Sequence, residues 1–176
     1  SLKINMNKIL LIPHPLLRQK AKALKKITKE DINLSKKMIK IMKEAPGVGL
    51  AANQIGVLKQ IVTIHILNNE KKSEKFYVMF NPIITKYSKE KVIMEEGCLS
   101  LPKQFADIER SKSIIVRYTN EQNKIIEGKK DGLEARILQH EIDHLSGKLF
   151  VDYLSSLKRN ILIKKVQKLV KMGQIQ

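Results

Sequence analysis

The sequence has 176 residues, of which 43% are hydrophobic and 29% charged, and this composition predicts a single folded domain over residues 1–176. The longest unbroken hydrophobic run extends only from Phe76 to Phe80, whereas a membrane-spanning helix needs about 20 apolar residues. These features exclude a disordered chain and a membrane-spanning one, and no membrane partner is expected. The single cysteine favours a reducing compartment, so we expect a cytoplasmic protein, or an organellar matrix protein whose transit peptide has been removed.

The chain is strongly basic, with 34 lysines and arginines against 17 acidic residues and a formal net charge of +17. Much of the excess lies in the flanks, and residues 153–176 contain basic but no acidic side chains. Because the chain has no tryptophan and few other aromatic residues, sequence-specific binding of nucleic acid is not expected. The lysines form either solvated faces or a surface that docks on a polyanion such as ribosomal RNA.

The first regular element predicted is a helix between Thr28 and Pro46. Thr28 and Asp31 form a capping-box pattern, and apolar residues follow at the spacing of a helix with one buried face. Beyond Val57 the sequence changes to short β-branched runs separated by turn-forming asparagines. We predict strands over residues 61–67, 76–80, 83–87, 113–119 and 124–126.

Two more helices are predicted in the last third of the chain. One spans residues 131–147, and the other begins near Tyr153 and gives residues 153–176 a basic outer face. Leu162 and Val166 lie on the opposite, apolar side of that last helix. Strands grouped between an N-terminal helix and two later helices predict an α+β fold with antiparallel sheets. The chain begins with serine, and we expect residues 1–6 to be a tag or a flexible segment.

The helix predicted over residues 131–147 contains the pattern His-Glu-x-x-His. Residues four apart share one face of a helix, so His140 and His144 can direct ring nitrogens at one metal ion, with Glu141 beside them. Leu133 and Ile137 fall on the same stripe and are expected to wall an apolar pocket next to the metal. The alternative is a pair of histidines without a metal, whose polar nitrogens would then need other partners.

Two histidines leave a metal ion short of ligands, so a third ligand is expected elsewhere in the chain. Asp152 is one candidate. Cys98 is another, in the segment Glu-Gly-Cys-Leu-Ser at residues 96–100, which is expected to be a tight glycine turn between strands. A lone cysteine can also be a small buried hydrophobe, so the residues alone leave the third ligand open.

A third segment, residues 47–54, reads Gly-Val-Gly-Leu-Ala-Ala-Asn-Gln. It is not a dinucleotide-binding loop, because a helix rather than a strand precedes it and no ribose-binding acid follows in a βαβ unit. Small residues here would allow the backbone of a substrate to come close, and Gln54 offers a side-chain amide.

Together, the segments at residues 47–54, 96–100 and 139–144 resemble the three signature motifs of the peptide deformylase family, in the family's order. The resemblance extends from about Pro13 to Tyr153. It implies antiparallel sheets packed around the histidine-bearing helix, with one helix before them and one after. The implied activity is metal-dependent hydrolysis of the N-formyl group from the formyl-methionine of newly made polypeptides, with release of formate.

The resemblance also implies the roles of individual residues. Cys98, His140 and His144 are expected to bind one divalent ion, which is Fe²⁺ in the cell and Zn²⁺, Ni²⁺ or Co²⁺ in many preparations. Glu141 is expected to act as general base and then as general acid. The sequence itself does not explain a preference for iron, because this ligand set suits zinc by geometry.

The same resemblance implies how an N-formyl-methionyl peptide is held. Gln54 and the backbone N–H of Leu99 are expected to stabilise the oxyanion that develops on the formyl group. The peptide is expected to bind as an added strand, with Phe105 at the mouth of the site and Arg136 on the side of the helix that faces the pocket. The remaining expected substrate contacts come from glycines and apolar residues: Val48, Gly49, Gly97, Leu133 and Ile137.

Two other classes of function compete with this one. A zinc-dependent endopeptidase would share the His-Glu-x-x-His helix but would need a third ligand other than Cys98. A basic ribosome-binding or RNA-binding module would use the lysines and would bind less tightly as salt increases. Ribosome docking through residues 153–176 is also compatible with a deformylase, because formylated chains emerge at the ribosome.

Overall fold

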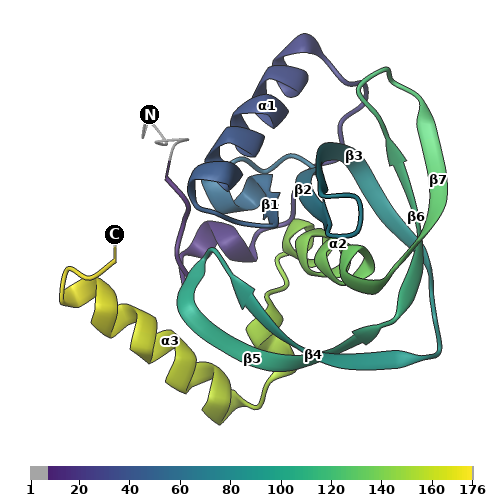
Figure 1. The fold of residues 1–176 in the computed structure, drawn as a ribbon. Coiled ribbons are helices and arrows are strands. Elements are labelled where there is room, and N and C mark those ends of the chain that lie inside the picture. Colours follow the sequence, from purple (N-terminus) through teal and green to yellow (C-terminus); the bar gives the residue numbers. More distant parts are fainter. Residues whose placement is uncertain (1–7, 176) are drawn as a thin grey trace.

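The computed structural model describes residues 8–175, which form two β-sheets and three α-helices (Figure 1). The expectation of a tag or flexible segment at residues 1–6 therefore lies outside the described residues. Among the helices of residues 8–175, none combines the length and the apolar character that a membrane span requires.

The larger sheet is antiparallel and has five strands in the order β1-β2-β3-β6-β7. These strands are β1 (Gly49–Ala51), β2 (Ile61–Asn68), β3 (Ser73–Tyr87), β6 (Ser113–Thr119) and β7 (Ile125–Asp131). The prediction of two strands at 76–80 and 83–87 was wrong, because both belong to β3. Asn81 adopts a left-handed φ of 52°, and the register with β6 shifts between Phe80 and Ile83. The asparagine-proline pair therefore makes a bulge that bends the strand without ending it.

The second sheet is a hairpin of β4 (Lys91–Cys98) and β5 (Leu101–Ser111). The expected tight turn lies at Leu99 and Ser100, whereas Gly97 and Cys98 are the last two residues of β4. Four of the eight residues of β4 are exposed, and its apolar run extends only from Val92 to Met94, which is why the sequence showed no long apolar run here. Cys98 therefore lies at the end of a strand, next to a two-residue turn.

The three helices are α1 (Lys29–Glu44), α2 (Gly132–Leu145) and α3 (Ser156–Lys171). The predicted capping box at Thr28 and Asp31 is present at the start of α1. The last helix begins at Ser156 and not near Tyr153, because a short 3₁₀ helix, η3 (Phe150–Tyr153), precedes it. Two further 3₁₀ helices are η1 (Pro15–Arg18) and η2 (Ala52–Ile55).

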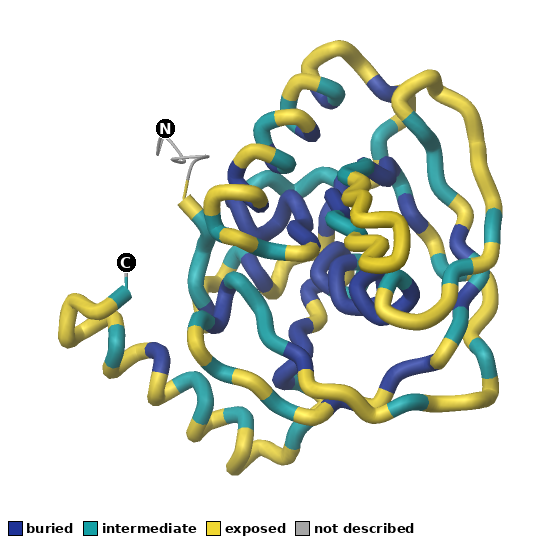
Figure 2. Tube along the Cα trace, viewed as in Figure 1, coloured by how far each residue is buried: buried dark blue, intermediate teal, exposed yellow. Residues whose placement is uncertain are grey.

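Helix α2 lies at the centre of the molecule, between the larger sheet and the β4–β5 hairpin (Figure 1). Figure 2 shows α2 as largely buried and α3 as largely exposed, and Val166 is the buried residue of α3. One side of α2 packs against the larger sheet through Ala135, Leu138 and Leu145. The predicted α+β fold, with antiparallel sheets around the histidine-bearing helix, is confirmed.

Candidate metal centre and active site

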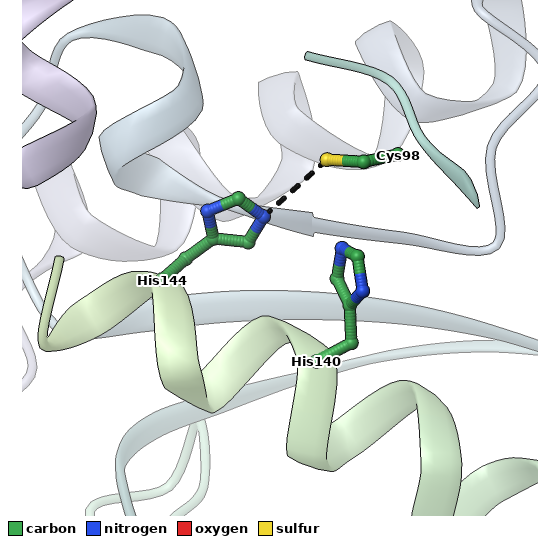
Figure 3. A group of neighbouring side chains, drawn as sticks. All are labelled: Cys98, His140 and His144. Atoms are coloured by element: carbon green, nitrogen blue, oxygen red, sulfur yellow. Dashed lines mark hydrogen bonds between the residues drawn. The ribbon is translucent and has the colours of Figure 1, made fainter. Parts of the chain in front are cut away.

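Three potential ligands from two elements meet at the centre of the molecule (Figure 3). The ligand atoms of Cys98, His140 and His144 all lie within 4.8 Å of one another. Cys98 Sγ is 3.5 Å from His144 Nε2. Sulfur and nitrogen ligands at about 2.3 and 2.1 Å from one ion, separated by a tetrahedral angle, lie about 3.6 Å apart. The distance between the Cys98 and His144 donor atoms therefore matches that of two ligands bound to a single metal ion.

The two histidines are buried, and their surroundings shift their pKa values in opposite directions. Burial and the neighbouring His140 lower the pKa of His144 well below its ordinary value, which keeps a lone pair available on its neutral ring. Burial opposes the charged form of His140, but Glu141, Cys98 and Glu96 together raise its pKa. A metal ion at the centre of the three residues would replace the proton that this negative environment attracts.

The other candidate for the third ligand is held elsewhere. Both carboxylate oxygens of Asp152 bind the guanidinium of Arg18, at 2.6 and 3.0 Å, and one of them also accepts from the Leu149 amide. The Asp152 carboxylate joins η1 to η3 in this way and is not part of the cluster with the two histidines. The structure thus brings Cys98, and not Asp152, to the paired imidazoles.

Glu141 is a buried carboxylate beside the three potential ligands. Its Oε1 atom has no hydrogen-bond partner in the part of the chain that the structure describes, and it lies 4.0 Å from His144 Nε2. Burial raises the pKa of Glu141 to about 7. Gly49 faces this carboxylate so closely that a Cβ atom there would lie 2.5 Å from Oε2. A larger residue at position 49 would therefore push against the Glu141 carboxylate.

Gln54 points its amide toward the same centre from η2. Its Oε1 atom accepts from the Ala51 amide at 2.9 Å, which orients the side chain. Its Nε2 atom donates to Ser100 Oγ at 3.1 Å and lies 3.6 Å from Cys98 Sγ. Leu99 follows Cys98 in the turn and packs against Gly47, where an added Cβ would meet the leucine side chain at 2.5 Å.

A cleft of about 490 Å³ leads to these residues from solvent. Gly49, Gln54, Cys98 and Glu141 line it, and Phe105 is 59% exposed at its edge. The Phe105 ring covers Gly97, where an added Cβ would approach the ring to 2.7 Å. A smaller pocket of about 130 Å³ adjoins the cleft, and its lining includes the predicted contacts Val48, Gly97, Leu133 and Ile137.

The sequence analysis missed the role of Glu96, which is 6% exposed. Glu96 Oε1 accepts from His140 Nδ1 at 3.0 Å, and Arg110 binds both carboxylate oxygens at 2.8 and 2.9 Å. Burial alone would raise the pKa of Glu96, but the hydrogen bonds from Arg110 and His140 lower it to about 2. In the sequence, Glu96 stands out only as the first residue of the cysteine segment. No pattern of neighbouring residues indicates its contact with the distant Arg110.

Metal-free protein is expected to lose stability as pH rises through about 7, because the pKa of Glu141 in the folded state, about 7, exceeds its ordinary value of 4.5. The folded state therefore holds this proton more tightly, and the resulting stabilisation is complete below pH ~4.5 and lost above pH ~7. The difference in pKa corresponds to about 3 kcal/mol. Urea unfolding should show E141Q gaining about this much relative to the parent between pH 4.5 and 8. A difference that does not change with pH would contradict this assignment.

The comparisons with known proteins all point to one family. A family model described as polypeptide deformylase matches residues 6–160. The peptide deformylase of Bartonella henselae is 41% identical over 171 residues, which cover 97% of this chain and 97% of that protein. The one from Pelagibacter ubique is 44% identical and covers 94% of this chain and 96% of its own. The crystal structure of peptide deformylase from Ehrlichia chaffeensis matches with a TM-score of 0.90 and 35% identity, over 96% of this chain and 98% of that one.

Proposed function

The chain belongs to the polypeptide deformylase family of hydrolases, which remove the N-formyl group from new polypeptides, and we propose that Glu141 and its neighbours carry out this reaction. The observation that carries the proposal is the meeting of Cys98, His140 and His144 at the inner end of a cleft that Gln54 and Glu141 also line. A cysteine ligand distinguishes this centre from the zinc endopeptidase alternative.

We infer that Cys98 Sγ and one nitrogen from each of His140 and His144 hold one divalent ion. For His140 this nitrogen is Nε2, because Nδ1 is bonded to Glu96. When bound, a divalent ion acts as a Lewis acid toward a carbonyl oxygen and lowers the pKa of a coordinated water to about 7. The resemblance favours Fe²⁺ in the cell, with Zn²⁺, Ni²⁺ or Co²⁺ as replacements, and metal analysis of protein purified without oxygen would identify the ion.

The peptide is proposed to bind in extended form between β1 and the end of β4. Val48, Gly49 and Gly97 would pair with its backbone as if it were an added strand. The methionine side chain would enter the pocket of about 130 Å³ beside Leu133 and Ile137. A formyl group is small enough to reach the centre, whereas a larger acyl group would clash.

Glu141 is proposed to move the proton. Its unpartnered Oε1 can accept a proton from the attacking water and then deliver it to the departing amine nitrogen. Gln54 Nε2 and the Leu99 N–H are the proposed donors to the carbonyl oxygen as it becomes negative.

Replacing Gln54 by glutamate is expected to lower kcat for formyl-peptide hydrolysis by about 10²- to 10³-fold with little change in KM. Glutamate keeps the acceptor that binds the Ala51 amide but loses the Nε2 donor, so the local turn should survive. Steady-state kinetics at matched metal content would measure this effect. A comparable increase in KM with an unchanged kcat would instead assign Gln54 to ground-state binding.

The reaction itself is tested with formyl-Met-Ala-Ser as substrate and acetyl-Met-Ala-Ser as the matched control. Protein purified without oxygen should release formate from the first peptide, while it should leave the second intact because the acetyl methyl group does not fit. Metal content is measured on the same sample. Metal-loaded protein that releases no formate would contradict the proposed function.

The basic helix α3 is proposed to dock on ribosomal RNA near the emerging chain. The helix contains no acidic residue, and it is exposed apart from residues such as Val166 that anchor it to the body. Changing Lys164, Lys165, Lys168 and Lys171 to glutamine should weaken ribosome binding about tenfold or more at low salt and reduce its dependence on salt. Hydrolysis of formyl-Met-Ala-Ser should not change.

The matched control changes Lys29, Lys36, Lys37 and Lys40 of α1 to glutamine, which removes the same charge from another helix. Ribosome binding is measured by co-sedimentation over a range of salt concentrations. If both variants lose the same affinity, the attraction comes from net charge and not from a docking surface on α3.

A further inference from the structure

A second arginine joins α2 to the β4–β5 hairpin next to the proposed metal centre. Arg136 is 5% exposed and lies one helical turn before His140. Its Nη1 atom donates to Glu96 Oε2 at 2.5 Å and to the Ile108 carbonyl at 2.9 Å, and its Nη2 atom donates to the Val92 carbonyl at 2.6 Å. One guanidinium from the helix therefore binds both strands of the hairpin. Arg136 also borders the smaller pocket, as the sequence predicted, but its guanidinium binds the Glu96 carboxylate.

Glu96 is the point at which this arginine meets the proposed metal ligands. Glu96 Oε2 accepts from Arg136 Nη1 and Arg110 Nε, while Oε1 accepts from Arg110 Nη2 and His140 Nδ1. Each oxygen thus has two donors, so the carboxylate cannot rotate without breaking a hydrogen bond. Because Nδ1 of His140 is occupied in this way, the orientation of the ring and of its Nε2 atom depends on Glu96.

The proposed ligands belong to elements that no shared backbone ladder joins. Cys98 ends β4, which among the described residues pairs only with β5, whereas His140 and His144 lie on α2. The distance from the sulfur to the imidazoles must therefore be set by side-chain contacts between the hairpin and the helix. Glu96 is two residues before Cys98, and Arg136 and His140 reach it from successive turns of α2.

We propose that Arg136 is a positioning residue for the metal centre. It clamps Glu96 of the hairpin to α2 and so holds Cys98 close enough to the two histidines for all three to bind one ion. This inference rests on the proposed function, in which these residues hold the ion. Without Arg136, Glu96 Oε2 would accept from Arg110 Nε alone. The carbonyls of Val92 and Ile108 would lose the hydrogen bonds that the guanidinium donates to them. Arg110 cannot replace it, because its remaining Nη1 donates to Asp143 at 2.9 Å.

The test compares R136M and R136K with the control variant R18M. Arg18 also forms a bidentate pair with a carboxylate, that of Asp152, but touches neither Glu96 nor the three ligands. Each protein is loaded with Co²⁺, and the rate of ion release to a chelator is measured together with the visible absorption of the Co²⁺–thiolate chromophore. These readouts report ligand geometry independently of catalysis.

R136M is expected to release Co²⁺ about 10- to 100-fold faster than the parent and to show altered visible absorption bands. R136K keeps the positive charge but not the planar guanidinium, so its rate of Co²⁺ release should lie between those of R136M and the parent. R18M should match the parent in both measurements. All comparisons are made at a temperature where circular dichroism shows folded protein.

A folded R136M protein that releases Co²⁺ within twofold of the parent rate and keeps the parent spectrum would overturn the inference. If R136M does not fold, R136K decides the question by the same criterion. Turnover of formyl-Met-Ala-Ser by the parent is measured separately. Its absence would contradict the proposed function, while the comparison of ion release would still report on Arg136.

Discussion

Replacing Glu141 by alanine is expected to lower kcat for formyl-peptide hydrolysis by about 10²- to 10⁴-fold while the protein still binds one equivalent of metal. Glu141 is not among the three clustered ligands, so the ion should remain bound. Its carboxylate is the acidic group that lines the cleft beside those ligands, and alanine offers no atom that could accept the proton. Steady-state kinetics and metal analysis on the same preparation would measure both effects.

Glu134 provides the matched control for this prediction. It lies in the first turn of the same helix and accepts a hydrogen bond from the Tyr77 hydroxyl at 2.7 Å, outside the cleft. E134Q should therefore retain nearly full activity. If E141A keeps more than about a tenth of the parent kcat at full metal content, Glu141 is not the group that transfers the proton.

Replacing Cys98 by alanine is expected to weaken metal binding by about 10³-fold or more and to abolish hydrolysis at ordinary metal concentrations. Loss of an outer hydrogen-bonding partner of a metal ligand already costs about 10- to 100-fold in affinity, and loss of a direct ligand should cost more. Cys98 is only partly buried, so the fold should tolerate the smaller residue. Competition with a fluorescent chelator would measure the affinity.

Ser100 provides a control next to this cysteine, because S100A removes a hydroxyl that accepts from Gln54 but leaves all three clustered donor atoms in place. It should bind metal as tightly as the parent does. C98A protein with stoichiometric metal and substantial activity would exclude Cys98 as a ligand and would favour the endopeptidase alternative.

Features that depend on neighbours in the chain could be predicted from the sequence alone. The capping box at Thr28 joins residues three apart, and the shared face of His140 and His144 follows from the 3.6-residue helical period, so both depend only on spacing within one helix. The α+β class also followed, because grouped β-branched runs and amphipathic patterns each indicate one kind of element. The bulge at Asn81 was missed, since its left-handed backbone is stabilised by two hydrogen bonds to the distant Leu24.

The sequence by itself therefore determined which residues share a helix face and, through three motifs, which family the chain resembles. Only the tertiary structure decided that Cys98 reaches His144 across 46 positions of the chain, that Asp152 does not join them, and that Glu96 orients His140. The reason is physical: local spacing fixes geometry within one element, whereas contacts between a hairpin and a helix depend on how the whole core packs and on which buried charges find partners.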